Sequence, residues 1–288
     1  MTSPRAAAEW ARGIRSKQGT VGFIPTMGAL HVGHLELVRK SVAENDATCV
    51  SVFVNPLQFD STADFEDYRR DLKQDAELLE TTGCDVVFTG ELTDFFPEMK
   101  GDPTDSDLIE SVDPGIRGVG LEGEHRSGHF EGVATIVKRL FQLIEPNRAY
   151  FGEKDFQQTL VVKELSRALG FPDIIVVPTY REPSGLAYSS RNERLTESER
   201  GVATSLSRGL FAAREAWAEG ERDADQLLSK INDELDSPLL EVEYVELRDP
   251  LRWELGALSG QLQTARALVA ARVGDVRLID NLALHSVQ

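Results

Sequence analysis

Two histidines, His31 and His34, stand three residues apart in a segment that also holds Gly28 and Gly33. Residues three apart on a helix share a face, and glycine lets the backbone come close to a ligand. Imidazole rings in such a setting can contact phosphate groups, so the His-x-Gly-His pattern indicates a nucleotide site. A plainer interpretation is that a histidine at the start of a helix only caps it.

The elements expected around these histidines favour the nucleotide interpretation. Val21–Ile24 are apolar and are followed by a proline, which predicts a buried strand. From His34 or the glycine before it, Leu35, Val38 and Val42 recur at helical spacing. The first turn of a helix has backbone N–H groups without helical partners and the positive end of the dipole, and both attract phosphate. The histidines are therefore expected where a strand turns into a helix.

Amide and ammonium groups follow the next expected strands. Asn55 and Gln58 come after an apolar run over 47–54, and Lys154 and Gln158 follow a short strand and a glycine. The ligand crevice of a parallel α/β sheet lies at the carboxyl ends of its strands. Amides suit a substrate with hydroxyl and carboxylate groups, and a lysine suits phosphate. The alternatives are a turn stabilised by asparagine and proline, and a lysine exposed to solvent.

Two less regular segments complete the set of candidates. Residues 91–126 lose periodicity and gain Gly, Pro and Asp, so we expect a wall or mobile lid over the crevice. Arg126 ends this segment, and His129 starts a helix with a long apolar face. The loop over 187–192 offers hydroxyls, a guanidinium and an amide, which could hold phosphate.

The order of elements changes near Arg181. A capping box begins at Thr196, two helices are expected to follow, and three strand-like runs come after them. The last two runs are joined by Gly274-Asp275, which is a hairpin signal. We expect an α/β domain with a parallel sheet over residues 1–181 and a smaller α+β domain over residues 182–288.

Composition limits the partners. The 288 residues carry a net charge of −17, which argues against broad nucleic-acid binding and against recruitment to anionic membranes. A local group of His, Lys and Arg can still attract a small anion. No apolar run is long enough to span a membrane, and no signal peptide is expected, so we expect a cytoplasmic protein. Cys49 and Cys84 are expected to be buried, reduced thiols.

Five segments in this order resemble the motif set of the pantoate–β-alanine ligases (pantothenate synthetases), a family of H-x-G-H nucleotidyltransferases. The segments are 25–34, 54–59, 128–133, 151–158 and 189–192. The resemblance implies a Rossmann-like N-terminal domain, a C-terminal lid domain and a homodimer. It also implies that ATP and Mg²⁺ are used to join (R)-pantoate to β-alanine through a pantoyl adenylate, with release of AMP and pyrophosphate.

The resemblance also implies roles for individual residues. His34 carries the family's proton-donor assignment, and His31, Lys154 and Asn55 are the other catalytic candidates. Gln58 and Gln158 would hold pantoate, and Gln58 would also lie near β-alanine. Arg126 and His129 would line the same cleft, while no metal ligands are implied. The expected ATP contacts are Met27, Gly28, Ala29, Leu30, His31, Val32, Gly33, His34, Gly152, Glu153, Lys154, Asp155, Tyr180, Tyr188, Ser189, Ser190 and Arg191.

Two departures from the family's pattern stand out. Tyr68-Arg69-Arg70 replaces the usual Tyr-Pro-Arg, and Tyr188 replaces a smaller Leu or Met beside the nucleotide. Neither change removes a reacting group, but the second leaves the adenosine contact open.

Three other functions compete with this interpretation. An H-x-G-H adenylyltransferase acting on a phosphorylated cofactor precursor would need basic residues for a second phosphate, whereas the amides suit a neutral substrate with a carboxylate. An aminoacyl-tRNA synthetase shares the motif but is opposed by the acidic chain and by the lack of an expected anticodon-binding domain. A zinc or structural protein would use His31, His34, His125 and His129, but these lie among glycines with no cysteine nearby.

Overall fold

The computed structural model describes residues 2–101 and 108–285. The chain divides into two units, Met1–Pro178 and Thr179–Gln288, and each is described here by itself. The boundary expected after Arg181 lies a few residues too late, because the Arg181 guanidinium donates to both carboxylate oxygens of Asp280 at 2.6 and 2.9 Å. Within the described residues, no helix is both long enough and apolar enough to cross a membrane.

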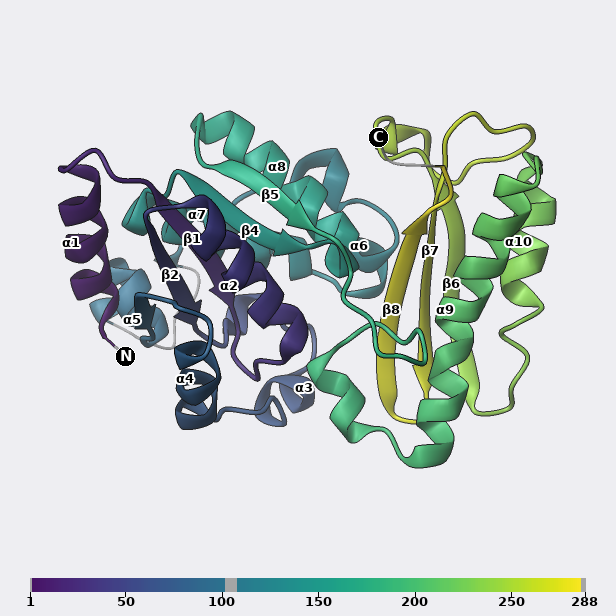
Figure 1. The fold of residues 1–288 in the computed structure, drawn as a ribbon, viewed down its shortest axis with the longest axis horizontal. Coiled ribbons are helices and arrows are strands. Elements are labelled where there is room, and N and C mark those ends of the chain that lie inside the picture. The colour runs from purple at the N-terminus through teal and green to yellow at the C-terminus, as the bar shows by residue number, and fades with distance from the viewer. Residues whose placement is uncertain (1, 102–107, 286–288) are drawn as a thin grey trace. The chain divides into compact units, whose positions relative to one another are not determined.

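The first unit is built on a five-stranded sheet with the order β3-β2-β1-β4-β5 (Figure 1). All four neighbouring pairs are parallel, which confirms the expected α/β fold with a Rossmann-like sheet. The strand order reverses beside β1, and ligands bind outside the carboxyl ends of strands at such a point. The strands are β1 (Val21–Thr26), β2 (Ala47–Val52), β3 (Val86–Phe88), β4 (Arg148–Gly152) and β5 (Asp173–Val177).

Helices cover both faces of this sheet. Phe23 of β1 belongs to a core cluster that includes residues of α1 and α7, while its neighbour Ile24 belongs to a cluster with residues of α2 and α4. Successive side chains of a strand point to opposite faces, so β1 is buried on both sides. The helices are α1 (Pro4–Arg15), α2 (Val32–Glu44), α3 (Thr62–Glu66), α4 (Leu72–Glu80), α7 (His129–Ile144) and α8 (Phe156–Leu169), with the 3-10 turn η1 (Pro56–Gln58) before α3.

The segment over 91–126 differs from the expected lid. Its described residues form the short helices α5 (Leu92–Phe95), η2 (Pro97–Gly101), η4 (Gly115–Gly118) and α6 (Glu122–His125), and residues 102–107 lie outside the described part. Phe95, Phe96 and Met99 are buried in the core of the first unit. The expectation of an irregular loop is therefore wrong over 92–99, because these apolar side chains anchor short helices in the core. A helix of four residues is too short to show periodicity in the sequence. The role of 91–126 as a wall or lid stays a prediction.

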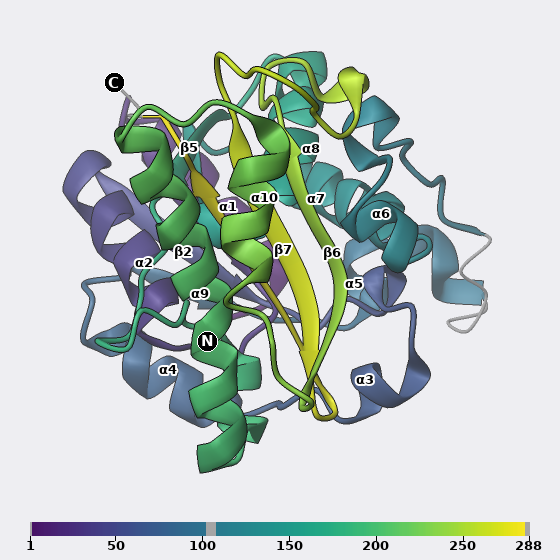
Figure 2. The same cartoon turned by 90° about the vertical axis from the view of Figure 1, so that its right-hand side faces the viewer.

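The second unit packs two helices on a three-stranded antiparallel sheet with the order β6-β7-β8 (Figure 2). Thr196 and Glu199 form the expected capping box at the start of the first helix. The last strand runs past the expected Ile279, because Asp280 and Asn281 are buried with polar partners. The elements are η6 (Ser190–Arg194), α9 (Glu197–Ala218), α10 (Ala224–Asn232), β6 (Leu240–Arg248), η7 (Trp253–Leu255), β7 (Arg266–Val273) and β8 (Val276–Ala283). The lid role of this unit stays a prediction.

Candidate active site

The turn after β1 is held by a buried carboxylate. Gly28 and Ala29 both have positive φ, at 82° and 50°, a conformation that a side chain disfavours. Asp75 of α4 accepts hydrogen bonds from the backbone N–H groups of Ala29 at 3.1 Å and Leu30 at 2.8 Å. A Cβ on Gly28 would lie 2.8 Å from Asp75 Oδ2, so the close approach requires glycine. Burial raises the pKa of Asp75, while its two N–H partners act to lower it.

Both histidines of the H-x-G-H segment cap α2. His31 is the N-cap residue, and its Nδ1 accepts from the Gly33 N–H at 3.2 Å. The Nδ1 of His34 accepts from the His31 N–H at 3.3 Å, and the ring centroids lie 4.1 Å apart. A neutral imidazole that accepts at Nδ1 carries its proton on Nε2. Each ring is therefore assigned the tautomer in which Nε2–H is the donor.

These caps change which groups are expected to donate hydrogen bonds to phosphate. The sequence predicted backbone N–H groups without helical partners at the start of the helix, but those of His31 and Gly33 donate to the histidine rings. In the preceding turn, the Ala29 and Leu30 N–H groups donate to Asp75. The plainer interpretation of the histidines, as caps, is thus also correct. Capping and phosphate binding are compatible, because capping uses Nδ1 and leaves the proton on Nε2.

The two imidazoles are neutral at pH 7. Burial, then His34 and Lys154, lowers the pKa of His31 to about 2. Burial and Lys154 lower the pKa of His34 to about 4, against an opposing effect of Asp155. Neither ring carries charge above pH 6, so each can donate a hydrogen bond while staying uncharged.

Lys154 supplies the positive charge next to these rings. It follows β4, which pairs with β1, and its ammonium lowers the pKa of both histidines. Its side chain is only 20% exposed, and Nζ lies 3.1 Å from Asp155 Oδ1. The structure therefore brings the sequence-predicted lysine to the histidine turn, and the alternative of a solvated surface lysine does not hold.

The amides after β2 form a second cluster. Asn55 and Gln58 are buried, and Asn55 Nδ2 donates to Gln58 Oε1 at 3.0 Å and to the carbonyl of Gly132 at 3.2 Å. Asn55 Oδ1 accepts from the Leu57 N–H at 3.3 Å, as the turn interpretation predicted. Asn55 is thus occupied by the protein itself, and it sets the orientation of the Gln58 amide.

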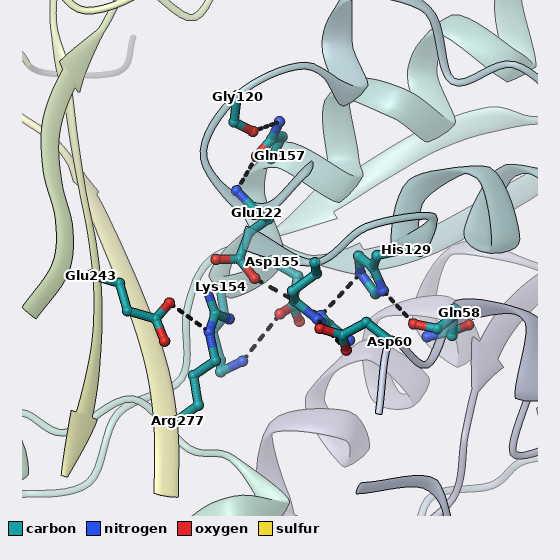
Figure 3. Close-up of polar contacts among 11 residues, drawn as sticks. Gln58, Asp60, Gly120, Glu122, His129, Lys154, Asp155, Gln157, Glu243 and Arg277 are labelled. Carbon is teal, nitrogen blue, oxygen red and sulfur yellow. Dashed lines mark hydrogen bonds and ion pairs between the residues drawn. The ribbon is translucent and has the colours of Figure 1, made fainter. Parts of the chain in front are cut away.

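His129 and Arg126 extend this cluster. The Arg126 guanidinium lies 3.1 Å from His129 Nε2. His129 Nδ1 lies 2.8 Å from the carbonyl of Gln58 (Figure 3). Arginine only donates, so Nε2 accepts and Nδ1–H donates to Gln58. Burial, and then Arg126, lowers the pKa of His129 to about 4. Glu122 and Asp60 face the same guanidinium at 3.8 and 3.7 Å.

Gln157 is a site residue that the sequence analysis missed, beside the predicted Gln158. It is 3% exposed, accepts from the Glu122 N–H at 3.1 Å and donates to the carbonyls of Arg117 and Gly120 (Figure 3). Gln157 therefore ties the segment before Arg126 to the first turn of α8. Gln158 is partly buried on the same turn.

Gln157 and Asp75 shared a signal in the sequence. Asp75 stands four residues before the buried Leu79, and Gln157 stands four residues before the buried Val161. A polar residue at helical spacing from a core residue can be buried too, and a buried polar group is hydrogen-bonded.

The remaining predicted ATP contacts lie in the second unit. Tyr180 and Tyr188 have ring centroids 5.6 Å apart and share a backbone hydrogen bond. Ser189 caps η6 by accepting from the Arg191 N–H at 3.2 Å, and Asn192 is buried beneath the loop, donating to Ala187 and Glu182. Tyr180, Tyr188, Ser189, Ser190 and Arg191 thus form one ordered region, and their contact with ATP stays a prediction.

The geometry opposes the zinc interpretation. Both ring nitrogens of His129 have protein partners, and the Nδ1 atoms of His31 and His34 cap a helix. Over residues 2–101 and 108–285, no three His, Cys, Asp or Glu side chains are grouped to hold a metal ion. The rings of His31 and His34 therefore have a different role from that of His129, and the geometry does not favour the three as ligands of one zinc ion.

The chain is similar to known proteins over almost its whole length. The family model for pantoate–β-alanine ligase matches residues 1–283. A pantothenate synthetase of Rubrobacter xylanophilus is 46% identical over 99% of this chain and 98% of its own. Pantothenate synthetase of Thermus thermophilus has a crystal structure that matches with a TM-score of 0.85 and 41% identity, covering 96% of this chain and 98% of that one.

A ligand-bound structure is also similar. Pantoate–β-alanine ligase of Francisella tularensis, complexed with β,γ ATP and β-alanine, matches with a TM-score of 0.77 and 32% identity. The match covers 100% of this chain and 98% of that one. The similarity therefore extends over both units of the chain.

Proposed function

Because this chain belongs to the pantoate–β-alanine ligase family, we propose that it joins (R)-pantoate to β-alanine with the conversion of ATP to AMP and pyrophosphate. Members of the family are ligases, and this chain is one. The observation that carries the proposal is a pair of neutral histidines beside Lys154 at the carboxyl edge of β1 and β4. Both rings accept backbone N–H groups at Nδ1 and so carry their proton on Nε2.

In the first half-reaction, a carboxylate oxygen of pantoate attacks the α-phosphorus of ATP and pyrophosphate leaves. Negative charge grows on the phosphoryl oxygens, and preorganised donors lower the energy of that state. We assign this role to the Nε2–H groups of His31 and His34 and to the Lys154 ammonium. His34, with a pKa of about 4, acts as a neutral hydrogen-bond donor in this scheme, which refines its expected role as a proton donor.

Gln58 and Gln158 are proposed to hold pantoate, and Gln58 also β-alanine. The Gln58 amide is fixed by Asn55, and its backbone carbonyl by His129. Asn55 is therefore proposed to act on substrate through Gln58, and Arg126 to act on Gln58 through His129. A glutamine amide both donates and accepts, which suits the hydroxyl and carboxylate groups of pantoate.

The adenylate is proposed to be consumed in the same crevice. The β-alanine amine attacks the acyl carbon of pantoyl adenylate, and AMP leaves as the amide bond forms. Correct positioning of a deprotonated amine can supply much of the rate of such a step. Residues 27–34 and 152–155 of the first unit, with Tyr180 and residues 188–191 of the second, are proposed to contact the nucleotide.

We propose that Mg²⁺ accompanies ATP. Mg²⁺ binds through one or two carboxylates together with water and substrate phosphates. Glu153 and Asp155 flank Lys154 in the sequence, and Asp155 Oδ1 lies 3.1 Å from Lys154 Nζ. This donor set fits an ion held largely by the nucleotide. When bound, the ion would neutralise charge on the phosphates.

A cytoplasmic location and a homodimer are also proposed. Cys49 and Cys84 are free thiols, and burial raises the pKa of both, that of Cys84 to about 12, as expected for unreactive thiols in a reducing compartment. The homodimer rests on the family resemblance. Light scattering of the purified chain would give twice the mass of one chain if this is correct.

Pyrophosphate release tests the function. Purified chain is mixed with ATP, Mg²⁺ and D-pantoate, first without and then with β-alanine. We expect a burst of about one pyrophosphate per site without β-alanine, and steady turnover with AMP formation after β-alanine is added. Absence of pantoate-dependent pyrophosphate would overturn the proposed substrate. Release with a phosphorylated cofactor precursor in its place would favour the competing adenylyltransferase.

A further inference from the structure

Asp75 is a buried carboxylate that none of the proposed catalytic steps uses. It lies on α4, a helix that contributes no predicted site residue, and it is 2% exposed. Both of its oxygens point at the turn after β1, where Oδ2 accepts from Ala29 N–H and Oδ1 from Leu30 N–H. A charge is seldom buried in this way without a specific task.

The turn that Asp75 holds is one that would not be stable by itself. Two consecutive residues, Gly28 and Ala29, adopt left-handed φ values, and the second of them carries a Cβ. Such turns aim neighbouring N–H groups at one point, which makes a small anion site. In this chain the protein supplies its own anion, because the Asp75 carboxylate accepts from the N–H groups of Ala29 and Leu30.

The position of the histidines depends on this turn. Leu30, whose N–H donates to Asp75, directly precedes His31. The His31 ring caps α2, and the His31 N–H donates a hydrogen bond to the ring of His34. A displaced Leu30 would move the cap and with it both rings. The chain of contacts therefore runs from α4 through the turn to the imidazoles.

We propose that Asp75 is a positioning residue of the nucleotide site, which sets the place of His31 and His34 for adenylate formation. This inference rests on the proposed function and adds a residue to it from outside the H-x-G-H segment. The carboxylate form is needed, because an asparagine has one oxygen that can accept and an NH₂ group that would face a second N–H group.

The test compares Asp75→Asn with Asp71→Asn. Asp71 caps the same helix by accepting from the Gln74 N–H at 3.0 Å, and it is exposed, so its variant makes the same chemical change on α4 without touching the turn. We expect Asp75→Asn to slow the pantoate-dependent pyrophosphate burst by roughly 10²-fold, since small misplacements of reacting groups have that effect. Pantoate affinity by calorimetry should stay within about twofold, and Asp71→Asn should keep the wild-type burst.

Two further arms make the outcome unambiguous. Asp75→Glu keeps the charge on a longer side chain and should recover part of the rate, and it replaces Asp75→Asn if the latter does not fold. A normal burst in Asp75→Asn, or equal losses in the Asp71 and Asp75 variants, would overturn the inference. If the wild-type chain releases no pyrophosphate with pantoate, the proposed function fails. The inference is then tested by the affinity for α,β-methylene-ATP, which should fall at least tenfold in Asp75→Asn alone; equal affinities would overturn it.

Discussion

Three histidines of the first unit, the partly buried His31 and His34 and the buried His129, have lowered pKa values but do not share one tautomer. His31 and His34 accept backbone N–H groups at Nδ1, so their protons are on Nε2. His129 meets the Arg126 guanidinium at Nε2 and a carbonyl at Nδ1, so its proton is on Nδ1 and points back into the protein. The comparison shows that burial keeps each ring neutral, whereas its hydrogen-bond partners decide which ring nitrogen carries the proton.

The largest effect is expected when the groups assigned to phosphate are removed. Lys154→Ala or His34→Ala should lower adenylate formation by roughly 10²-fold or more while the fold stays intact, because a preorganised charge stabiliser is lost. The pantoate-dependent pyrophosphate burst measures this rate. Lys73→Ala is the matched control, since Lys73 is an exposed lysine on α4 that pairs with Glu77. Near-normal adenylate formation in either variant would contradict the assigned roles.

A smaller effect is expected from a change at Gln58, whose backbone carbonyl accepts a hydrogen bond from His129. Gln58→Ala should weaken pantoate binding by roughly tenfold, the scale of one or two lost hydrogen bonds, with little change in ATP affinity. Calorimetry with D-pantoate measures it. Gln226→Ala, an exposed glutamine on α10, provides the control. Unchanged pantoate affinity in Gln58→Ala would count against this placement of pantoate.

The sequence was informative where one local rule decided the structure. Apolar runs and helical spacing predicted the strands of the parallel sheet and the main helices, and the glycine turn predicted the strand-to-helix junction at His31. The same rules brought Asn55, Gln58 and Lys154 to the carboxyl edge, because parallel strands end at the same edge of the sheet.

Long-range contacts were the part that local rules could not supply. The partner of the Ala29 and Leu30 N–H groups is Asp75, which lies more than forty residues along the chain. The tautomer of His129 depends on Arg126 and on a carbonyl 71 positions earlier. Phe95, Phe96 and Met99 looked like part of a loop, because only the folded core shows what they pack against.

The lowered pKa values predict how stability depends on pH. A histidine with a folded pKa of about 4 stays neutral between about pH 6.5 and 4, where the unfolded ring takes up a proton, so stability falls as the pH falls through this range. At pH 5 one such ring costs about 2 kcal/mol relative to high pH. His129→Gln should therefore make the loss of stability between pH 7 and 5 smaller by about that amount. Hydrogen exchange of β1 amides measures it in the first unit.

His285→Gln, in the second unit, is the control for this measurement. It should leave the pH dependence of β1 unchanged. An equally steep loss of stability in His129→Gln and wild type would mean that His129 is charged in the folded protein. The tautomer assigned from its two contacts would then be wrong.

The smallest expected effect is a flat pH profile for adenylate formation between pH 6 and 8. The pKa of His34 is about 4 without ligand, and the phosphates of ATP would have to raise it by about two units, near 3 kcal/mol, before its charge changed in this range. The single-turnover pyrophosphate burst measures the rate, and His34→Gln, which keeps an N–H donor, should retain more of it than His34→Ala. A rate that falls as the pH rises through this range, and no longer does so in His34→Gln, would mean that His34 donates a proton instead of a hydrogen bond. The contrast with His129 would then be one of charge as well as of tautomer.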